Sequence, residues 1–360
     1  MVPFNVLAPG DDAPAVRAAI DRVIASGWFI LGPEVEAFEA EFAAASQVTH
    51  AVGVGTGTDA ITLILRALDI GPGDEVITPP LSAAYSALAV MMAGARPVFA
   101  DIDPERLTLD PQAAAAAITP RTRALLPVHL YGQTADMASL EALAARHHLA
   151  LVEDAAQAHL GTAAGRPIGT IGVAAATSFY PTKNLGALGD GGAVLTRDAA
   201  LAARIKRLRN GGQSSRYRHE EPGANSRLDE MQAAILRARL PFLAGWTARR
   251  RAIAARYRSA LAGASVHVPR EYDAGHVYHL FPVLAEDRDG LQDHMKTRGV
   301  ETLIHYPVPI PRQPALALAN PAMCAVAERV CSQVVSLPMY PALADSSVAT
   351  VVDAAVSYGR

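Results

Sequence analysis

One lysine stands where the sequence could support covalent chemistry on an amine or a carbonyl compound. Lys183 lies in the run SFYPTKNLGALGDGG at residues 178–192, and about thirty residues earlier an apolar run at 149–152 leads into Glu153 and Asp154. Pyridoxal phosphate chemistry needs a lysine that forms a Schiff base and a carboxylate that keeps the pyridine nitrogen protonated. A lysine on a solvated turn is the ordinary alternative for any single lysine, and these neighbours weigh against it.

A second motif lies where a short apolar strand, residues 50–54, gives way to a helix. It reads GTGTD at residues 55–59. Gly57 would allow a ligand to approach the backbone closely, and the N–H groups at a helix N-terminus bind phosphate, with Thr58 adding a hydroxyl. Taken alone, the motif is equally compatible with an ordinary helix cap by a threonine or by Asp59. It lacks the Gly-Lys-Ser/Thr ending of a nucleoside-triphosphate loop.

Further polar side chains flank the lysine and the aspartate. Ser178, five residues before Lys183, could bind the cofactor phosphate through its hydroxyl. Gln157, three residues after Asp154, could reach the same ligand if the segment turns helically. His159 could line the site or cap a turn. A carboxylate at the end of an apolar strand is unfavourable unless it is paired, although Asp154 could instead cap a helix.

The composition narrows the classes of partner. The 360 residues include 32 basic and 35 acidic side chains, a balance that argues against nucleic acid as the main partner. No stretch approaches the roughly 20 apolar residues of a membrane span, and the N-terminus lacks a signal-peptide pattern, so we expect a cytoplasmic protein without a membrane partner. Cys324 and Cys331 are expected to be reduced packing thiols, and no metal site is expected.

Strands alternate with helices over the first two thirds of the chain. A helical segment at 11–45, broken at 28–33, comes first. Strands are then expected at 50–54, 75–78, 97–100, 124–129 and 149–152, and helices at 60–68, 86–93 and 139–147. This alternation predicts a largely parallel sheet covered on both faces.

The regular alternation of strands and helices ends after about Pro241. An arginine-rich helix is expected at 244–261, a strand at 277–284 and a helix at 292–298. We therefore place a large cofactor-binding domain at residues 1–240, including the N-terminal helical segment, and a smaller α/β domain at 241–360.

Together these motifs resemble the DegT/StrS family of pyridoxal-phosphate-dependent nucleotide-sugar aminotransferases. The matching stretches span nearly the whole chain in family order: GTDA at 57–60, GPGDEV at 71–76, PVHLYGQ at 127–133, residues 153–159 and 178–192, NSRLDEMQAA at 225–234, and HYP at 305–307. The resemblance implies an α/β fold of the aspartate aminotransferase type (fold type I), with a large, mostly parallel sheet domain and a smaller C-terminal α/β domain. It also implies a homodimer with active sites at the subunit interface.

The resemblance also implies how the cofactor is held. Asn225 would contact the phosphate of the partner's cofactor, a role compatible with capping the helix that follows. The family commonly stacks an aromatic residue on the pyridine ring, but Ser82 and Ala83 stand at that pair here, and Tyr85 is the candidate replacement. Lys183, Asp154 and His159 are the expected catalytic residues. The expected cofactor-binding residues are Gly57, Thr58, Asp59, Tyr85, Asp154, Gln157, Ser178, Lys183 and Asn225.

The run around the lysine resembles enzymes that aminate a keto group at carbon 3 of a nucleotide-linked sugar. The resemblance to that group implies that His159 and Tyr180 face the sugar side of the cofactor. His305 and Tyr306 are expected substrate contacts in the smaller domain. Arg312 stands where the family usually has a histidine before a Gln-Pro pair, and it could pair with a diphosphate or carboxylate or lie exposed on a loop.

The resemblance thus predicts transfer of an amino group from an amino acid, with glutamate as the expected donor, to a nucleotide-linked keto sugar. Amination at carbon 4 is the main alternative. A sugar dehydratase or a non-catalytic regulator is less favoured. The retained Lys183 weighs against the dehydratase, because histidine replaces that lysine in the dehydratases of the family.

Overall fold

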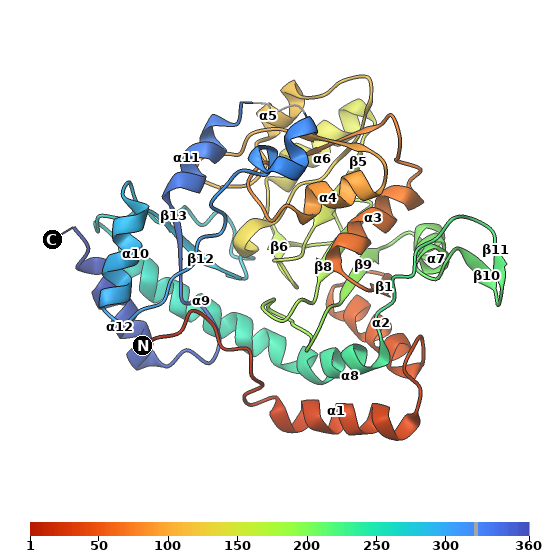
Figure 1. Ribbon diagram of the computed structural model, residues 1–360, viewed down its shortest axis with the longest axis horizontal. Coiled ribbons are helices and arrows are strands. Elements are labelled where there is room, and N and C mark those ends of the chain that lie inside the picture. Colours follow the sequence, from red (N-terminus) through yellow and green to blue (C-terminus); the bar gives the residue numbers. More distant parts are fainter. Residues whose placement is uncertain (320–322, 360) are drawn as a thin grey trace.

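A seven-stranded sheet forms the centre of the protein. The computed structural model describes residues 1–319 and 323–359 (Figure 1). The strand order is β1-β9-β8-β5-β4-β2-β3, and only β9 runs antiparallel to its neighbours, so the sheet is largely parallel as predicted. The strands are β1 His50–Val54, β2 Glu75–Thr78, β3 Arg96–Phe99, β4 Thr122–Leu125, β5 Ala150–Asp154, β8 Ala174–Ser178 and β9 Gly192–Thr196.

Helices cover both faces of this sheet. Successive strand residues point to opposite faces, so Val76 of β2 joins one buried cluster while Ile77 joins the other. The first cluster includes side chains from α3 (Gly57–Ala67), α4 (Tyr85–Met92) and α7 (Ala199–Leu208). The second includes side chains from α2 (Pro33–Ala45), α5 (Pro111–Ala116), α6 (Met137–His147) and α8 (Glu230–Arg239). Helix α1 (Ala13–Ser26) packs on α8 outside these layers (Figure 1).

A second cluster of elements follows the long helix α9 (Leu243–Ala260). Strands β12 (Phe281–Leu284) and β13 (Val334–Leu337) pair antiparallel and pack with α10 (Arg288–Thr297) and α12 (Asp345–Val356) around a core of their own. Helix α11 (Ala325–Gln333) joins this part to the sheet domain through a shared apolar cluster that buries Cys324 and Cys331, both free thiols.

The start of the chain lies with this second part. Val2 bridges Val300 and belongs to the core around α9, and the Phe4 N–H donates to Glu301 at 2.8 Å. Figure 1 shows the N-terminus beside α10 and α12. The predicted division at residues 240 and 241 remains a prediction, and these first residues are an exception to it.

Short elements complete the structure. Two small hairpins, β6–β7 and β10–β11, lie outside the main sheet, and the second projects from the large domain (Figure 1). Within the described residues, no helix combines the length and apolar character needed to cross a membrane. The hairpin strands are β6 Thr162–Ala163, β7 Arg166–Pro167, β10 Gln213–Ser215 and β11 Arg218–His219, and the 3-10 turns are Leu130–Gly132, Leu240–Phe242, Ile310–Arg312 and Pro314–Ala319.

Two predicted strands are shorter than expected. Only Phe281–Leu284 of the segment 277–284 joins a sheet, because the Val277 N–H bonds to the Gly132 carbonyl at 3.0 Å and draws the preceding residues toward the sheet domain. Strand β4 ends at Leu125, and Val128 forms an isolated bridge with Asp154 instead. In both places the chain leaves its strand beside residues of the candidate site.

Candidate active site

A cavity of about 880 Å³ opens between the carboxyl ends of the parallel strands and the smaller domain. Ligands of open α/β sheets characteristically bind outside the carboxyl ends of the strands. Asp154 is the last residue of β5, and Ser178 is the last residue of β8. The sheet domain contributes Thr56, Gly57, Thr58, Ile61, Ser82, Ala83, Tyr85, Ser86, Val128, Asp154, Ala156, Gln157, Ser178, Tyr180, Thr182, Lys183, Asp190 and Gly191 to the lining, and the smaller domain contributes Arg250, His279, Leu280, Glu301, Leu303, His305, Tyr306 and Met339.

Asp154 is buried and fixed at both its backbone and its side chain. Its exposed fraction is 5%, the Ser86 hydroxyl donates to Oδ2 at 2.7 Å, and the Ala156 N–H donates to Oδ1 at 3.1 Å. The Asp154 N–H donates to the Pro127 carbonyl at 2.9 Å, which extends the sheet by one bridge beside Val128. A buried carboxylate in this position can hold a protonated ring nitrogen in a defined place.

The residue before Asp154 anchors the same strand from the opposite face. Glu153 is fully buried, and its side chain lies 3.1 Å from His129 Nε2 and accepts the Gly172 N–H at 2.9 Å. The His129 N–H in turn donates to the Asp154 carbonyl at 3.0 Å. A fully bonded buried pair of this kind restrains the strand end, so the position of Asp154 depends on more than its own contacts.

Lys183 lies in the turn between β8 and β9, and its amine enters the cavity. Its backbone N–H donates to the Tyr180 carbonyl at 2.8 Å. Burial lowers the pKa of Lys183 from 10.5 to about 8, and the nearby Asp154 carboxylate opposes this fall. The amine is therefore neutral in an appreciable fraction of molecules near neutral pH, as a nucleophile or proton carrier must be.

The first turn of α3 forms a cradle for an anion next to Ser178. Thr56 is the N-cap, and its hydroxyl accepts the Asp59 N–H at 3.0 Å. Helix N-termini leave their first N–H groups free to bind phosphate, and Gly57 and Thr58 supply those groups here. A Cβ atom on Gly57 would stand 2.8 Å from the Ser178 Cβ, so only glycine allows β8 and α3 to approach this closely.

The residues that could hold pyridoxal phosphate therefore meet in one cavity. The α3 cradle with Ser178 suits the phosphate, Asp154 suits the ring nitrogen, and Lys183 suits the aldehyde carbon. The cavity volume also leaves room for a second, larger ligand. Ten of the predicted site residues line it: Gly57, Thr58, Tyr85, Asp154, Gln157, Ser178, Tyr180, Lys183, His305 and Tyr306.

Gln157 joins the two parts of the protein across this cavity. Its Nε2 donates to the Tyr306 hydroxyl at 3.2 Å, and its Oε1 accepts the Tyr131 N–H at 2.7 Å. The Tyr131 hydroxyl donates to the His305 carbonyl, and the Phe4 ring stacks on the His305 ring at 5.6 Å. The N-terminal segment and the HYP motif thus form one wall of the site.

His159 does not line the cavity, which corrects the prediction that it faces the substrate. Its ring stacks on Phe179 at 5.6 Å and meets the edge of Phe42 at 6.4 Å. It is buried, and neither ring nitrogen makes a hydrogen bond of good geometry. Burial lowers the pKa of His159 to about 3, the Lys183 charge adds to the fall, and the Ser178 backbone opposes it. A neutral imidazole packed among phenylalanines acts as part of the core.

Three other predicted site residues also lie outside the cavity lining. The Arg312 guanidinium pairs with Glu328 at 2.6 Å on the surface, and its contact with a substrate stays a prediction. Asp59 accepts the Ser226 hydroxyl at 2.8 Å and supports the start of α3 from behind. Asn225 is exposed and bridges Asn210 through the backbone, a position from which it could reach a partner subunit.

Two tyrosines stand exposed at the cavity. Tyr85, the first residue of α4, is 64% exposed, and Tyr180 is 52% exposed. Ala83 also lines the cavity and leaves space where an aromatic ring would otherwise stack. The stacking role of Tyr85 remains a prediction.

Several residues that line the cavity were not predicted from the sequence. Ser86 and His279 carry polar side chains into the site, and Arg250 reaches it from α9. Phe4 and Leu7 come from the opposite end of the chain. No local spacing marks these residues, because long-range folding alone brings them to the cavity. The HVYHLF run around His279 was the one usable signal, a polar residue inside a predicted strand.

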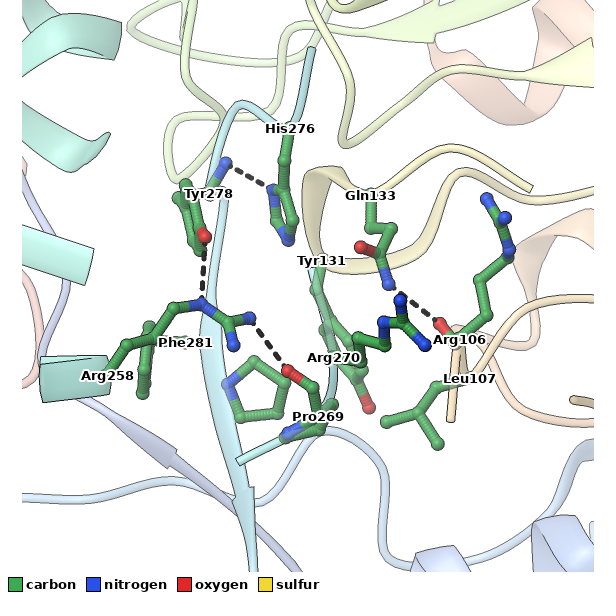
Figure 2. Close-up of a pocket in the computed structure, with 11 residues that line it drawn as sticks. Arg106, Leu107, Tyr131, Gln133, Arg258, Pro269, Arg270, His276, Tyr278 and Phe281 are labelled. Carbon is green, nitrogen blue, oxygen red and sulfur yellow. Dashed lines mark hydrogen bonds between the residues drawn. The ribbon is translucent and has the colours of Figure 1, made fainter. Parts of the chain in front are cut away.

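A second, small cavity lies behind the segment that carries His279. Its volume is about 20 Å³, room for a single water, and Figure 2 shows its lining side chains. Arg258 donates to the Tyr278 hydroxyl at 3.0 Å and to the Pro269 carbonyl at 2.7 Å, and the rings of His276 and Tyr278 stack at 3.8 Å (Figure 2). These contacts restrain the residues on either side of His279.

Comparison of the sequence with known proteins finds aminotransferases. The model of the DegT/DnrJ/EryC1/StrS aminotransferase family matches residues 11–356. The dTDP-3-amino-3,4,6-trideoxy-alpha-D-glucose transaminase of Streptomyces venezuelae is 53% identical over 341 residues, covering 94% of this chain and 90% of that protein. The UDP-N-acetyl-3-dehydro-alpha-D-glucosamine 3-aminotransferase of Acidithiobacillus ferrooxidans is 44% identical over 338 residues, covering 93% and 91%.

Comparison with solved structures finds an aminotransferase-family protein of the same fold. The crystal structure of DesV from S. venezuelae superposes with a TM-score of 0.96 at 52% identity and covers 98% of this chain and 97% of its own. This likeness confirms the predicted fold class. The chain, with its lysine, aspartate and phosphate cradle in one cavity, belongs to the DegT/DnrJ/EryC1/StrS aminotransferase family.

Proposed function

We propose that this protein transfers an amino group from an amino acid to the keto group at carbon 3 of a nucleotide-linked sugar, with pyridoxal phosphate as cofactor. The meeting of Lys183, Asp154 and the α3 cradle in one cavity is the observation that carries the proposal. The two relatives support carbon 3, because one is named for a 3-amino sugar and the other is named a 3-aminotransferase of a 3-dehydro sugar, although their nucleotides differ. Glutamate is the proposed donor.

The residues of the site have separate tasks in this reaction. Bound pyridoxal phosphate supplies a ring that withdraws electrons from the reacting carbon. The N–H groups of Gly57 and Thr58 and the Ser178 hydroxyl hold its phosphate, and Asp154 holds its ring nitrogen in the protonated form.

Lys183 carries the proton in both halves of the reaction. Its Nζ would remove a proton from the α-carbon of the donor, whose nitrogen would pass to the bound cofactor while water supplies the oxygen of the departing keto acid. In the second half Nζ would deliver a proton to carbon 3 of the sugar, which would receive the same nitrogen, and the keto oxygen of the sugar would leave as water. Because the pKa of Lys183 is about 8, the same amine can accept and release a proton near neutral pH.

The proposal is tested with purified protein, pyridoxal phosphate, glutamate and a matched pair of nucleotide-linked 3-keto and 4-keto sugars. Mass spectrometry should find an amino sugar from the 3-keto substrate and 2-oxoglutarate in equal amount. Amination of only the 4-keto sugar would contradict carbon 3, and loss of a hydroxyl without nitrogen transfer would indicate a dehydratase.

We further propose a homodimer with shared active sites, working in the cytoplasm. Several large apolar side chains of the single chain are exposed to solvent, including Trp28 at 56%, Phe29 at 53% and Tyr217 at 79% exposure. Trp28 and Phe29 are neighbours in the chain, and exposed apolar surface of this kind is typical of a protein interface. In such a dimer the exposed Asn225 would contact the phosphate in the partner's site. Cell fractionation would test the location.

A further inference from the structure

One arginine of the active-site cavity carries a buried positive charge. Arg250 lies on α9, is 4% exposed and lines the cavity. Two other arginines of the same helix, Arg249 and Arg256, each pair with Asp345 at 2.9 Å. Within the part of the chain that the structure describes, no carboxylate pairs with Arg250. Buried charges in proteins are normally paired, so this one lacks its counterion.

Backbone carbonyls fix the Arg250 guanidinium in place without removing its charge. Nη1 donates to the Tyr278 and His279 carbonyls, both at 3.2 Å, and to the Met339 carbonyl at 2.7 Å. Nε is buried without a hydrogen-bond partner, and among the described residues Nη2 has none either. Nη2 is therefore the amino group left for a ligand of the cavity to bind.

The electrostatics of the cavity favour an anionic ligand. Burial lowers the pKa of Arg250 to about 10, and no neighbouring carboxylate opposes the fall, so the group stays protonated at neutral pH. Burial also holds the pKa of His279 well below its usual value, and the charges of Lys183 and Arg250 add to this effect. Both cations thus act on one buried residue of the cavity wall, and an anion placed near it would be stabilised by each of them.

We propose that Arg250 binds a carboxylate of the amino-acid donor through Nη2 and so holds the donor beside Lys183. The inference rests on the proposed function, in which Lys183 acts on the carbon that bears the carboxylate of an α-amino acid. A carboxylate is compact enough to reach a guanidinium that is 4% exposed. The phosphates of the nucleotide-linked sugar are the alternative anion, and they are attached to a much bulkier group.

The test compares two kinds of anion by calorimetry, with the protein loaded with pyridoxal phosphate. Glutarate has the two carboxylates of glutamate but no amine, so it binds without reacting, and dTDP and UDP represent the nucleotides. In Arg250→Gln the affinity for glutarate should fall about tenfold to a hundredfold, because a hydrogen bond between two ionised groups is lost. The affinities for dTDP and UDP should change by less than about twofold.

Arg251→Gln is the matched control. Arg251 is the next residue of α9 and supports the same segment, because its Nε donates to the His276 carbonyl at 2.9 Å, but the cavity lining does not include it. Its replacement should leave the glutarate affinity within about twofold. Equal loss in both variants would show that the two arginines only support the segment, and would overturn the proposal. Unchanged glutarate affinity in Arg250→Gln, or a loss confined to dTDP and UDP, would overturn it as well.

Two further measurements decide the matter if Arg250→Gln folds poorly. In the unmodified protein glutaramide, which has the shape of glutarate without its charge, should bind at least about tenfold more weakly than glutarate. Arg250→Lys retains the charge but not the second amino group, so it should bind glutarate more weakly and keep the preference over glutaramide. Equal binding of the two compounds by the unmodified protein would contradict a charged partner.

None of these measurements uses a sugar substrate. A protein that aminates the 3-keto sugar but fails the glutarate test would lose only the role given to Arg250, whereas failure of the amination assay alone would leave that role standing.

Discussion

At the scale of single residues, the chemistry of the site depends on a carboxylate and an amine that burial holds close together. The Asp154 carboxylate is bonded to Ser86 and to the Ala156 N–H, and it opposes the effect of burial on the pKa of Lys183. The Asp154 carboxylate thus favours the protonated form of the Lys183 amine, while burial favours the neutral form.

Replacing Asp154 with asparagine should leave the fold intact and slow the half-reaction with glutamate. A neutral amide cannot hold the ring nitrogen protonated, so we expect at least a hundredfold loss, about 3 kcal/mol of barrier. Cofactor absorbance in single-turnover experiments measures this rate. Ser86→Ala, which removes one hydrogen bond from the same carboxylate, is the graded comparison and should cost about tenfold or less. Near-normal turnover in Asp154→Asn would refute the role given to Asp154.

The lowered pKa of Lys183 predicts the pH dependence of cofactor attachment. Only the neutral amine attacks an aldehyde, so the rate at which cofactor-free protein reacts with pyridoxal phosphate should rise with pH and level off above about 8. A lysine with the ordinary value of 10.5 would continue to gain rate up to that pH. Stopped-flow absorbance across pH 6 to about 10 separates the two cases.

Residue patterns in the sequence predicted many of the side chains that meet in the cavity but missed several of their neighbours. Asp154 and Gln157 meet in the cavity because they follow the predicted strand at 149–152, whereas Ser178 and Lys183 follow β8, a strand that the sequence pattern did not predict. His159 follows the same motif but turns into the aromatic cluster around Phe179, and no local spacing reveals which side of a turn a side chain takes.

At the scale of elements, the site depends on how closely β8 and α3 approach each other. Strands at 50–54 and 75–78 were predicted to the residue, because apolar strands buried on both faces have clear limits. The segment 277–284 was predicted as one strand, yet its first half bonds to the turn at Tyr131 and Gly132. Such contacts between distant parts of the chain leave no periodic signal in the sequence.

Gly57→Ala tests the approach of β8 and α3. The added Cβ would meet the Ser178 Cβ at 2.8 Å and push the α3 cradle away from the strand, so affinity for pyridoxal phosphate should fall about tenfold or more. Gly245→Ala in α9 is the control, because no atom lies within 4 Å of its Cβ position and alanine favours a helix. Equal cofactor affinity in the two variants would contradict the close approach.

At the scale of the whole molecule, we propose that a second copy of the chain completes the site. Asn225 is exposed and absent from the lining of its own cavity, and apolar side chains such as Trp28 and Phe29 remain uncovered. The homodimer was expected from the family resemblance alone, because no pattern within one chain shows which surface a second copy covers.

Mixing an inactive Lys183→Ala variant with an Asn225→Ala variant that binds the cofactor weakly tests this shared site. Lys183→Ala chains and Asn225→Ala chains should form heterodimers in which one of the two sites draws Lys183 and Asn225 from the chains that retain them. Activity and tight cofactor binding should therefore recover to about half the normal level per exchanged dimer. Differently tagged chains verify the exchange. Heterodimers without recovery would show that Asn225 serves its own subunit or only supports local structure.

The most direct test of the account is to identify the lysine that carries the cofactor. The protein is incubated with pyridoxal phosphate, reduced with borohydride, digested and analysed by mass spectrometry. We predict a pyridoxyl group on Lys183 and none on Lys206 or Lys296, with the label abolished in Lys183→Ala. A label on either of the other two lysines, or one that persists in Lys183→Ala, would contradict the account.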